Sequence, residues 1–322
     1  MDFSNLIEGL GGYTIDGLTK GSIYALVALG YTLVYGVLRL INFAHGEVFM
    51  VGAWTVLGVY TALGADSGVG VPLAIGITLL AGLVAATATA GTALVIERVA
   101  YKPLRDKNAP RLIVLITAIG CSMVLMELFG HAFKVWFPGA QFGRAAVNIP
   151  TIIPTQEAFS IGGVGVSNID LIVIVAGVAM MIVLDQFVNK SRLGRGVRAV
   201  AQDPDTASLM GVNKDRIIVL VFVIGGVAAG LAALLHTLKY DFAKFDMGFL
   251  IGMKAFTAAV LGGIGNLRGA LVGGLLLGIC EVYSSAVISS NWEDVTAFVI
   301  LVVVLMFRPT GILGESLGKA RA

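Results

Sequence analysis

Charged residues are scarce in this chain of 322 residues. They make up 13% of it, against 57% hydrophobic residues and a mean hydropathy of +0.91, whereas a soluble domain carries about 25% charged residues. So few charges exclude a soluble globule of this size, because they could not cover its surface. The net charge of +2 gives no sign of a nucleic-acid partner. The composition instead favours a protein whose solvent is largely lipid.

Residues that would carry catalysis, metal binding or disulfide bonds are also missing. Cys121 and Cys280 stand in separate apolar runs, without a Cys or His at metal-ligand spacing. The phosphate-binding pattern G-x-x-x-x-G-K-[ST] and the catalytic patterns H-E-x-x-H and G-x-S-x-G occur nowhere. We therefore expect no catalytic residue, no metal, no cofactor and no ATP hydrolysis by this chain. Residues 1–20 lack the basic and apolar regions of a cleaved signal peptide.

Long apolar runs fill most of the sequence. A membrane-spanning helix needs about 20 mostly apolar residues, and nine runs approach that length, although 249–264 and 292–308 are short. The sequence therefore predicts an all-α polytopic membrane protein, a single transmembrane domain over 1–322 with eight or nine membrane helices. The predicted spans are 21–38, 47–65, 71–97, 112–133, 169–189, 217–238, 249–264, 269–288 and 292–308.

Lysine and arginine are distributed unevenly between the loops. If the N-terminus lies outside, most of the 22 basic residues fall in cytoplasmic segments, as the positive-inside rule requires. We therefore expect an N-out, C-in topology with a cytoplasmic loop at 190–216 and a periplasmic loop at 134–168. The periplasmic loop contains three prolines, and with residues 239–246 it is expected to dock a periplasmic partner. A plain connector is the alternative.

Two similar turns precede apolar runs in the same predicted orientation. One lies at 41–46 and the other at 265–269, and each places an Asn before a Gly. Two parallel repeats would suit a transporter fold. Chance similarity between Gly-rich apolar segments is the alternative to an internal parallel repeat.

The loop 190–216 contains the start and stop signals of one short helix. Asp203 has the side chain of an N-cap, and Pro204 suits the first helical position, where no N–H is needed. Asp205 lies in the first turn, where the helix dipole favours an anion. Gly211 suits the left-handed position that follows the last turn. These signals predict a helix of about seven residues between them.

Two apolar residues, Leu209 and Met210, stand in this otherwise polar loop. A helix of seven residues is about 10 Å long and is marginal alone in water, so something must hold it. Either it docks on a partner protein, or it is a capped turn that packs on its own helix ends.

The same loop and both ends of the chain resemble a known family, the branched-chain amino acid permeases of ATP-binding-cassette importers (the LivH type). The motifs that carry the resemblance are G-S-I-Y-A-L at 21–26, G-Y-T-L-V-Y-G at 30–36, I-N-F-A-H-G-E at 41–47, A-Q-D-P at 201–204, L-M-G-V at 209–212 and L-G-G-I-G-N at 261–266.

The resemblance implies a multi-pass permease subunit in the inner membrane that carries leucine, isoleucine or valine. It implies that a second permease, related or identical, completes the pore, that two separate ATPase subunits bind the cytoplasmic coupling loop, and that a periplasmic binding protein delivers the substrate. Urea and short-amide importers use similar permeases and are the alternative. The residues that would contact an ATPase subunit are Asp203, Pro204, Asp205, Thr206, Ala207, Leu209, Met210 and Gly211.

Polar residues at the ends of apolar spans are costly and therefore suggest functional roles. Asn42, His45 and Glu47 cluster at the first inner turn, and Asn266 stands in the matching turn. We expect these four residues to line the translocation path. The alternative is that they hold each turn together by hydrogen bonds.

Glu127 and Glu281 stand inside predicted spans. An ion-coupled secondary transporter would use such carboxylates as proton or sodium sites, whereas we expect them to bond to neighbouring helices. The capped helix and the family resemblance argue against that rival. A passive channel is a further alternative, and ATP-independent transport would distinguish both from an importer.

Overall fold

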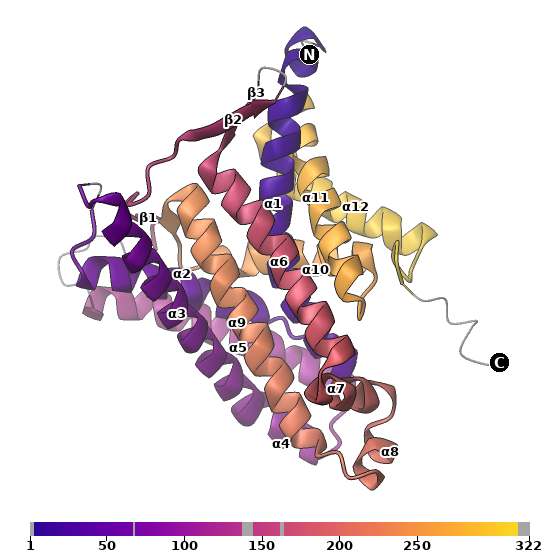
Figure 1. Ribbon diagram of the computed structural model, residues 1–322. Coiled ribbons are helices and arrows are strands. Elements are labelled where there is room, and N and C mark those ends of the chain that lie inside the picture. Colours follow the sequence, from indigo (N-terminus) through magenta and orange to yellow (C-terminus); the bar gives the residue numbers. More distant parts are fainter. Residues whose placement is uncertain (1–2, 67, 137–143, 162–163, 315–322) are drawn as a thin grey trace. The chain divides into compact units, whose positions relative to one another are not determined.

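The computed structural model describes residues 3–66, 68–136, 144–161 and 164–314 (Figure 1). Most of these residues are helical, so the all-α prediction is confirmed, with four short strands added. The helices are α1 (Phe3–Leu38), α2 (His45–Ala62), α3 (Val71–Ile96), the π-turn η1 (Glu97–Tyr101), α4 (Lys102–Asp106), α5 (Arg111–Trp136), α6 (Asn168–Lys190), α7 (Arg192–Gln202), α8 (Pro204–Leu209), α9 (Lys214–Tyr240), α10 (Met247–Gly262), α11 (Leu267–Val287), the 3-10 turn η2 (Ser290–Trp292) and α12 (Glu293–Phe307). The strands are β1 (Val147–Asn148), β2 (Glu157–Ile161), β3 (Val164–Ser167) and β4 (Phe242–Ala243).

Among the described residues, 7 helical segments are long and apolar enough to cross a membrane. The predicted spans 47–65 and 249–264 fall on α2, which begins with polar residues, and on α10, which has 16 residues. At 1.5 Å per residue α10 is about 24 Å long, less than the roughly 30 Å of the hydrocarbon core. The number of spans and their orientation therefore stay predictions. The seven segments are Gly9–Leu38, Val71–Asp106, Arg111–His131, Asn168–Lys190, Lys214–Tyr240, Leu267–Val287 and Ser290–Phe307.

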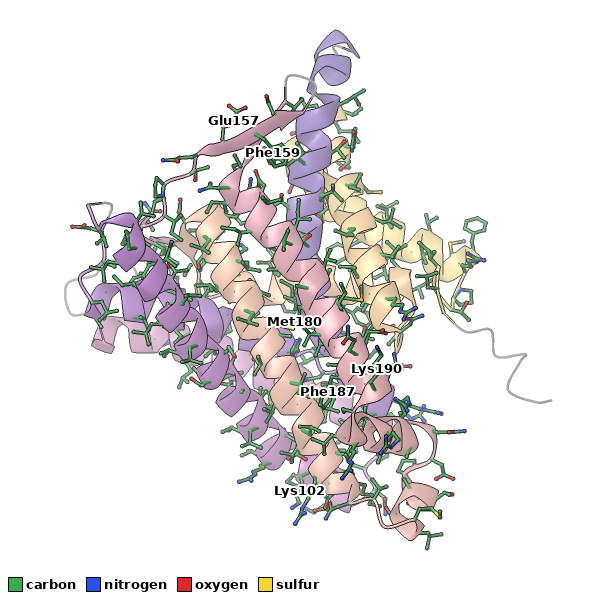
Figure 2. The ribbon with its side chains drawn as sticks, viewed as in Figure 1. Lys102, Glu157, Phe159, Met180, Phe187 and Lys190 are labelled. Atoms are coloured by element: carbon green, nitrogen blue, oxygen red, sulfur yellow. The ribbon has the colours of Figure 1, made fainter. Side chains whose placement is uncertain are left out.

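Large apolar side chains are exposed along α3, α5, α6 and α12. Leu79 is 68% exposed, Val124 66% and Val183 60%, and Figure 2 shows side chains projecting along the whole of α6, with Met180, Phe187 and Lys190 labelled. Surfaces of this kind in water would favour aggregation, whereas lipid tails accept them. The chain is a multi-pass membrane protein.

Helix α1 is longer than predicted. The span 21–38 covers only its C-terminal half, because the helix already begins at Phe3. The early turns pack on α11: a Cβ on Gly17 would lie 2.8 Å from the Cα of Ile279, and the hydroxyl of Thr14 bonds that of Tyr283 at 2.8 Å. Tertiary packing of this kind cannot be read from hydropathy, which explains the missed start.

The chain divides into two compact units, each assembled from distant segments. The first unit is 1–32, 155–191 and 254–322, and the second is 33–154 and 192–253. Of the four boundaries between them, those at 32/33 and 253/254 fall inside α1 and α10, and those at 154/155 and 191/192 fall in connections between elements. The single domain expected over 1–322 stays a prediction.

In the second unit α2, α3 and α9 pack closely against one another. Small residues allow the approach: a Cβ on Gly226 would lie 2.7 Å from the carbonyl oxygen of Thr89, and one on Gly230 would lie 2.9 Å from that of Ala85. Gly226 and Gly230 have the G-x-x-x-G spacing that brings membrane helices into backbone contact. Packing alone therefore accounts for this glycine pair.

The first unit contains a buried charge cluster centred on Glu281 of α11. Glu281 is 0% exposed; it accepts a hydrogen bond from the hydroxyl of Tyr24 at 2.8 Å and forms ion pairs of 3.2 Å with both Lys20 and Lys254. The prediction that Glu281 bonds to neighbouring helices is confirmed, since its partners come from α1 and α10. A buried charge is tolerable only when it is paired in this way.

The same two lysines hold the start of α12. Lys20 pairs with Glu293, and Lys254 pairs with Asp294 at 2.6 Å. Helix α12 also packs against α11, although Ala297 alone of its residues is buried. The ion pairs and this packing together hold α12 on the unit.

The prediction that Glu127 bonds to neighbouring helices is wrong. Its carboxylate binds Arg144, at 2.7 and 2.8 Å, and lies 3.6 Å from His131 of its own helix. Neither described partner comes from a neighbouring helix. The side chain is 44% exposed, in keeping with the small share of α5 that is buried.

Candidate functional site

The predicted cytoplasmic loop 190–216 contains two helices where one was expected. The additional helix is α7, whose buried residues Gly194, Val197 and Val200 recur at helical spacing. It packs against α8 and α9. The sequence contains this helical spacing of apolar residues. The segment is short and arginines interrupt it, so its hydropathy does not indicate a helix.

Helix α8 begins at the residues that predicted it. One carboxylate oxygen of Asp203 accepts from the backbone N–H groups of Asp205 (3.0 Å) and Thr206 (3.1 Å), and the other accepts from the hydroxyl of Thr206 (2.6 Å). Pro204 occupies the first helical position. The hydrogen bonds from Thr206, and then from Asp205, hold the pKa of the Asp203 carboxyl below its ordinary value. The N-terminus of α8 is thus defined by local side-chain chemistry.

The C-terminus of α8 is defined equally well. Gly211 has a φ of +86°, in the left-handed region that favours glycine. Its N–H donates to the carbonyl of Ser208, and the N–H of Val212 donates to that of Ala207, both at 3.0 Å. These are the two bonds of a Schellman motif. The helix has six residues, Pro204–Leu209, one fewer than predicted.

The apolar residues of α8 split between inside and outside. Ala207 is buried and holds the helix on its own unit, whereas Leu209 is 88% exposed and Met210 81%. An ion pair of 3.6 Å joins Asp205 to Lys214 at the start of α9. Packing on its own unit therefore explains Ala207 but leaves Leu209 and Met210 projecting into solvent.

The predicted path residues Asn42, His45 and Glu47 lie together in a buried turn before and within the first turn of α2. The three side chains are at most 3% exposed. The hydroxyl of Tyr101 bonds Oδ1 of Asn42 at 3.0 Å, and that of Ser122 donates to Oε1 of Glu47 at 3.1 Å. The turn is buried, and partners from η1 and α5 hold it by these hydrogen bonds.

The second carboxylate oxygen of Glu47 lies against the start of α10. A Cβ on Gly248 would lie 2.5 Å from this Oε2 and 2.6 Å from the carbonyl of Gly46, so only glycine fits there. Oε2 has no hydrogen-bond partner within the described residues. No group of three or more His, Cys, Asp or Glu suited to a metal ion occurs in that part of the chain.

Asn266 plays a different local role from Asn42. Its Oδ1 accepts from the N–H groups of Arg268 (3.0 Å) and Gly269 (3.2 Å), so it is the N-cap of α11. Its amide donates to the carbonyl of Leu313 at 2.9 Å. The residue before α2 is Ala44, which gives no side-chain cap. The two turns are thus built differently, and the internal repeat stays a prediction.

Part of the predicted periplasmic loop meets the segment expected to act with it. Strand β1 pairs with β4, with Val147 opposite Ala243, and Thr151 bonds the carboxylate of Asp241 at 2.9 Å. Burial raises the pKa of the Asp241 carboxyl, against the effect of that bond. Residues 137–143 and 162–163 of this loop lie outside the described residues.

Comparison with known proteins settles the family. Residues 13–305 match the model of the branched-chain amino acid transport system permease component. The chain belongs to this family. It is 44% identical to the high-affinity branched-chain amino acid transport system permease protein BraD of Pseudomonas aeruginosa, over 94% of each chain. It is 42% identical to LivH of Escherichia coli K12 and 41% identical to LivH of Salmonella typhimurium, over 93% of this chain and 94% of each relative.

Proposed function

We propose that this chain is the membrane-spanning permease subunit of an ATP-driven importer of leucine, isoleucine and valine in the inner membrane. The observation that carries the proposal is the family membership, which extends over nearly the whole chain. Within this assignment, 1–322 acts as one permease domain. The chain itself hydrolyses no ATP, because its sequence has no phosphate-binding loop.

The partners follow from this assignment. A second permease subunit, related or identical, would complete the pore, two ATPase subunits would bind on the cytoplasmic side, and a periplasmic protein would deliver the amino acid. The paired segments at 147–151 and 241–243 support a docking surface for that protein, made by the loop 134–168 with residues 239–246.

Residues 203–211 form the ATPase contact in this proposal. A helix of six residues transmits motion only if its ends are fixed, and α8 is capped at both. Leu209 and Met210 supply an exposed apolar surface that a partner would cover. The ion pair between Asp205 and Lys214 connects α8 to α9, so that displacement of α8 would act on a membrane helix.

The buried turn at Asn42, His45 and Glu47 forms the inner end of the path in this proposal, with Asn266 in the second turn. His45 is 2% exposed here, so a cysteine in its place should react with a small thiol reagent only when the path opens. The test uses a background without Cys121 and Cys280, in each nucleotide state. Absence of labelling in every state would leave His45 a structural role.

The ion-coupled rival loses its candidate sites. Glu281 is already paired with two lysines, and Glu127 is bound by Arg144, so neither carboxylate is poised to take up a transported ion. Competition between labelled leucine and unlabelled urea distinguishes this proposal from the alternative of a urea or short-amide importer.

Uptake by the reconstituted complex tests the function. We expect labelled leucine to enter proteoliposomes only with ATP and binding protein present, and unlabelled isoleucine or valine to compete where urea does not. The purified chain alone should show no ATPase activity. Leucine uptake without ATP would favour the ion-coupled rival or a channel, and competition by urea would favour the other substrate class.

A further inference from the structure

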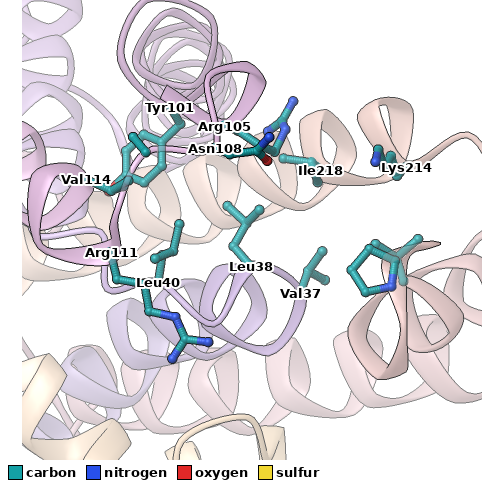
Figure 3. A pocket seen from close by; sticks show the side chains of 13 residues that line it. Val37, Leu38, Leu40, Tyr101, Arg105, Asn108, Arg111, Val114, Lys214 and Ile218 are labelled. Carbon is teal, nitrogen blue, oxygen red and sulfur yellow. The ribbon is translucent and has the colours of Figure 1, made fainter. Parts of the chain in front are cut away.

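A cavity of about 350 Å³ opens in the second unit beside α8 (Figure 3). Its walls come from the end of α1, the segment from η1 to α5, α7, the first residue of α8 and the start of α9. The volume lies within the roughly 300–1,000 Å³ of ligand sites. None of the path residues or the Glu281 cluster lines it.

The charged residues of the lining are all cationic: Arg105, Arg111 and Lys214. Arg105 is held by Glu97 at 3.2 Å and by Asp215 at 3.0 Å, so its position is fixed and its charge largely balanced. The guanidinium of Arg111 has no ion pair or hydrogen bond within the described residues. Lys214 has only the long pair with Asp205. Two cations are thus available to an anion.

The remaining walls are mostly apolar. Leu38 and Leu40 of the α1 end, Val114 of α5 and Ile218 of α9 line the cavity (Figure 3). From Arg111 onward α5 carries exposed apolar side chains, among them Leu112 at 64% and Ile116 at 59%. A ligand with an anionic group and a long hydrocarbon chain matches these cationic and apolar walls. A small anion would leave the apolar side chains in contact with water.

The cavity lies where apolar helices end. The candidate spans stop at Leu38 and Asp106 and start at Arg111 and Lys214, and these residues either line the cavity or stand beside residues that do. Helix ends with basic residues lie at the level of lipid headgroups, and basic pockets between membrane helices on the cytoplasmic side suit anionic headgroups.

We propose that this cavity binds an anionic phospholipid such as phosphatidylglycerol. Lys214 at one end of the cavity and Arg111 at the other would both attract its anionic headgroup (Figure 3), and an acyl chain would follow the exposed face of α5. Because Pro204 is part of the wall and Lys214 also pairs with Asp205, a bound phosphate competes for the ammonium that ties α8 to α9. The lipid would therefore regulate the ATPase contact, a consequence that rests on the proposed function.

Lipid retention tests the site without any transport assay. The purified full chain is exchanged into nanodiscs of phosphatidylcholine with about 10% phosphatidylglycerol, re-extracted in detergent, and analysed for bound lipid by native mass spectrometry. We expect phosphatidylglycerol to be retained by the wild type and its retention to fall about thirtyfold in the double variant Arg111→Gln, Lys214→Gln, since each of the two cations contributes about 1 kcal/mol near an anionic surface.

Matched controls make the result specific. Arg195→Gln and Arg216→Gln remove exposed charges of α7 and α9 that do not line the cavity, and we expect both variants to retain phosphatidylglycerol. Equal loss in these controls, or full retention in the double variant, would overturn the site. Displacement by millimolar glycerol phosphate would show that a free phosphate suffices and would overturn the lipid assignment. If leucine uptake then fails for every variant and the wild type, the importer assignment is at fault and the lipid site is not.

Discussion

Helix α8 and the Glu281 cluster are two polar regions in opposite surroundings. Leu209 on α8 is 88% exposed, and the helix is defined by bonds between residues of one short segment, 203–212. Glu281 is 0% exposed, and its partners come from helices more than two hundred residues away or from α10. Helix α8 is thus defined by bonds within its own segment and exposes its apolar side chains, whereas the Glu281 cluster forms only when distant helices pack together.

This difference separates roles that a mutational screen would otherwise confuse. Removing one partner from a buried ion pair leaves an uncompensated charge and unfolds proteins. Substituting an exposed side chain of a capped helix changes stability little when it is not part of a cap. A loss of import in variants of Leu209 or Met210 therefore reports function, whereas a loss in Glu281 variants reports folding first.

The largest expected effect is that of Glu281→Gln. Lys20 and Lys254, whose side chains are 17% and 8% exposed, would lose the carboxylate between them, at a cost of about 3–5 kcal/mol. Thermal unfolding in detergent measures it. Glu293→Gln is the control, because the Glu293 side chain is 25% exposed and should cost much less. Equal stability of Glu281→Gln and the wild type would show that the cluster does not hold the unit.

A smaller effect is expected for Gly211→Val. The left-handed backbone would be strained by about 1–2 kcal/mol, local to the end of α8, so expression should persist while leucine import falls strongly. Gly64→Val is the matched control, because Gly64 also has a positive φ, +60°, with open space around it. If leucine import survives Gly211→Val, or falls equally in Gly64→Val, the proposal that α8 forms the ATPase contact would be contradicted.

The N-cap offers a chemical test with a pH signature. The pKa of Asp203 is depressed in the folded protein, so its ionised cap stabilises α8 above the ordinary value of 3.8 and is lost as pH falls through the lower folded value. Protection of the Thr206 amide from hydrogen exchange should therefore be independent of this group between about pH 5 and 8.

Substitution at the same position sharpens this test. Asp203→Asn should keep both protection and import, because Asn also caps, whereas Asp203→Ala should lose protection first. Loss of protection between pH 5 and 8 in the wild type, or equal protection in Asp203→Ala, would contradict the capping role.

The smallest effect on stability is expected for Leu209→Ser, within about 0.5 kcal/mol. Import should nevertheless fall, because the exposed leucine contributes to a partner contact in this account. Leu193→Ser on α7 is the control, since Leu193 is 53% exposed and lies outside the contact. An unchanged rate of leucine uptake by Leu209→Ser would show that this side chain contacts no partner.

The comparison also explains what the sequence could predict. Asp203 and Gly211 signal their roles through local backbone rules, so the helix and both caps follow from the order of residues. The membrane class follows from apolar run length. The pairing of Lys20 and Lys254 does not, because Lys20 precedes one predicted span, Lys254 lies inside another, and they meet Glu281 only after distant helices pack. The close contact of Gly248 with Glu47 likewise depends on tertiary packing, and a sequence with many glycines does not indicate which of them makes such a contact.

The most direct test of the account is crosslinking from position 209. Leu209→Cys is placed in a chain without Cys121 and Cys280, together with ATPase subunits, and treated with a short bifunctional thiol reagent. The account predicts a crosslink to an ATPase subunit whose yield changes with nucleotide, and none from a cysteine at the exposed Leu193 of α7. No crosslink from position 209 in any nucleotide state, in a complex that still imports leucine, would contradict it.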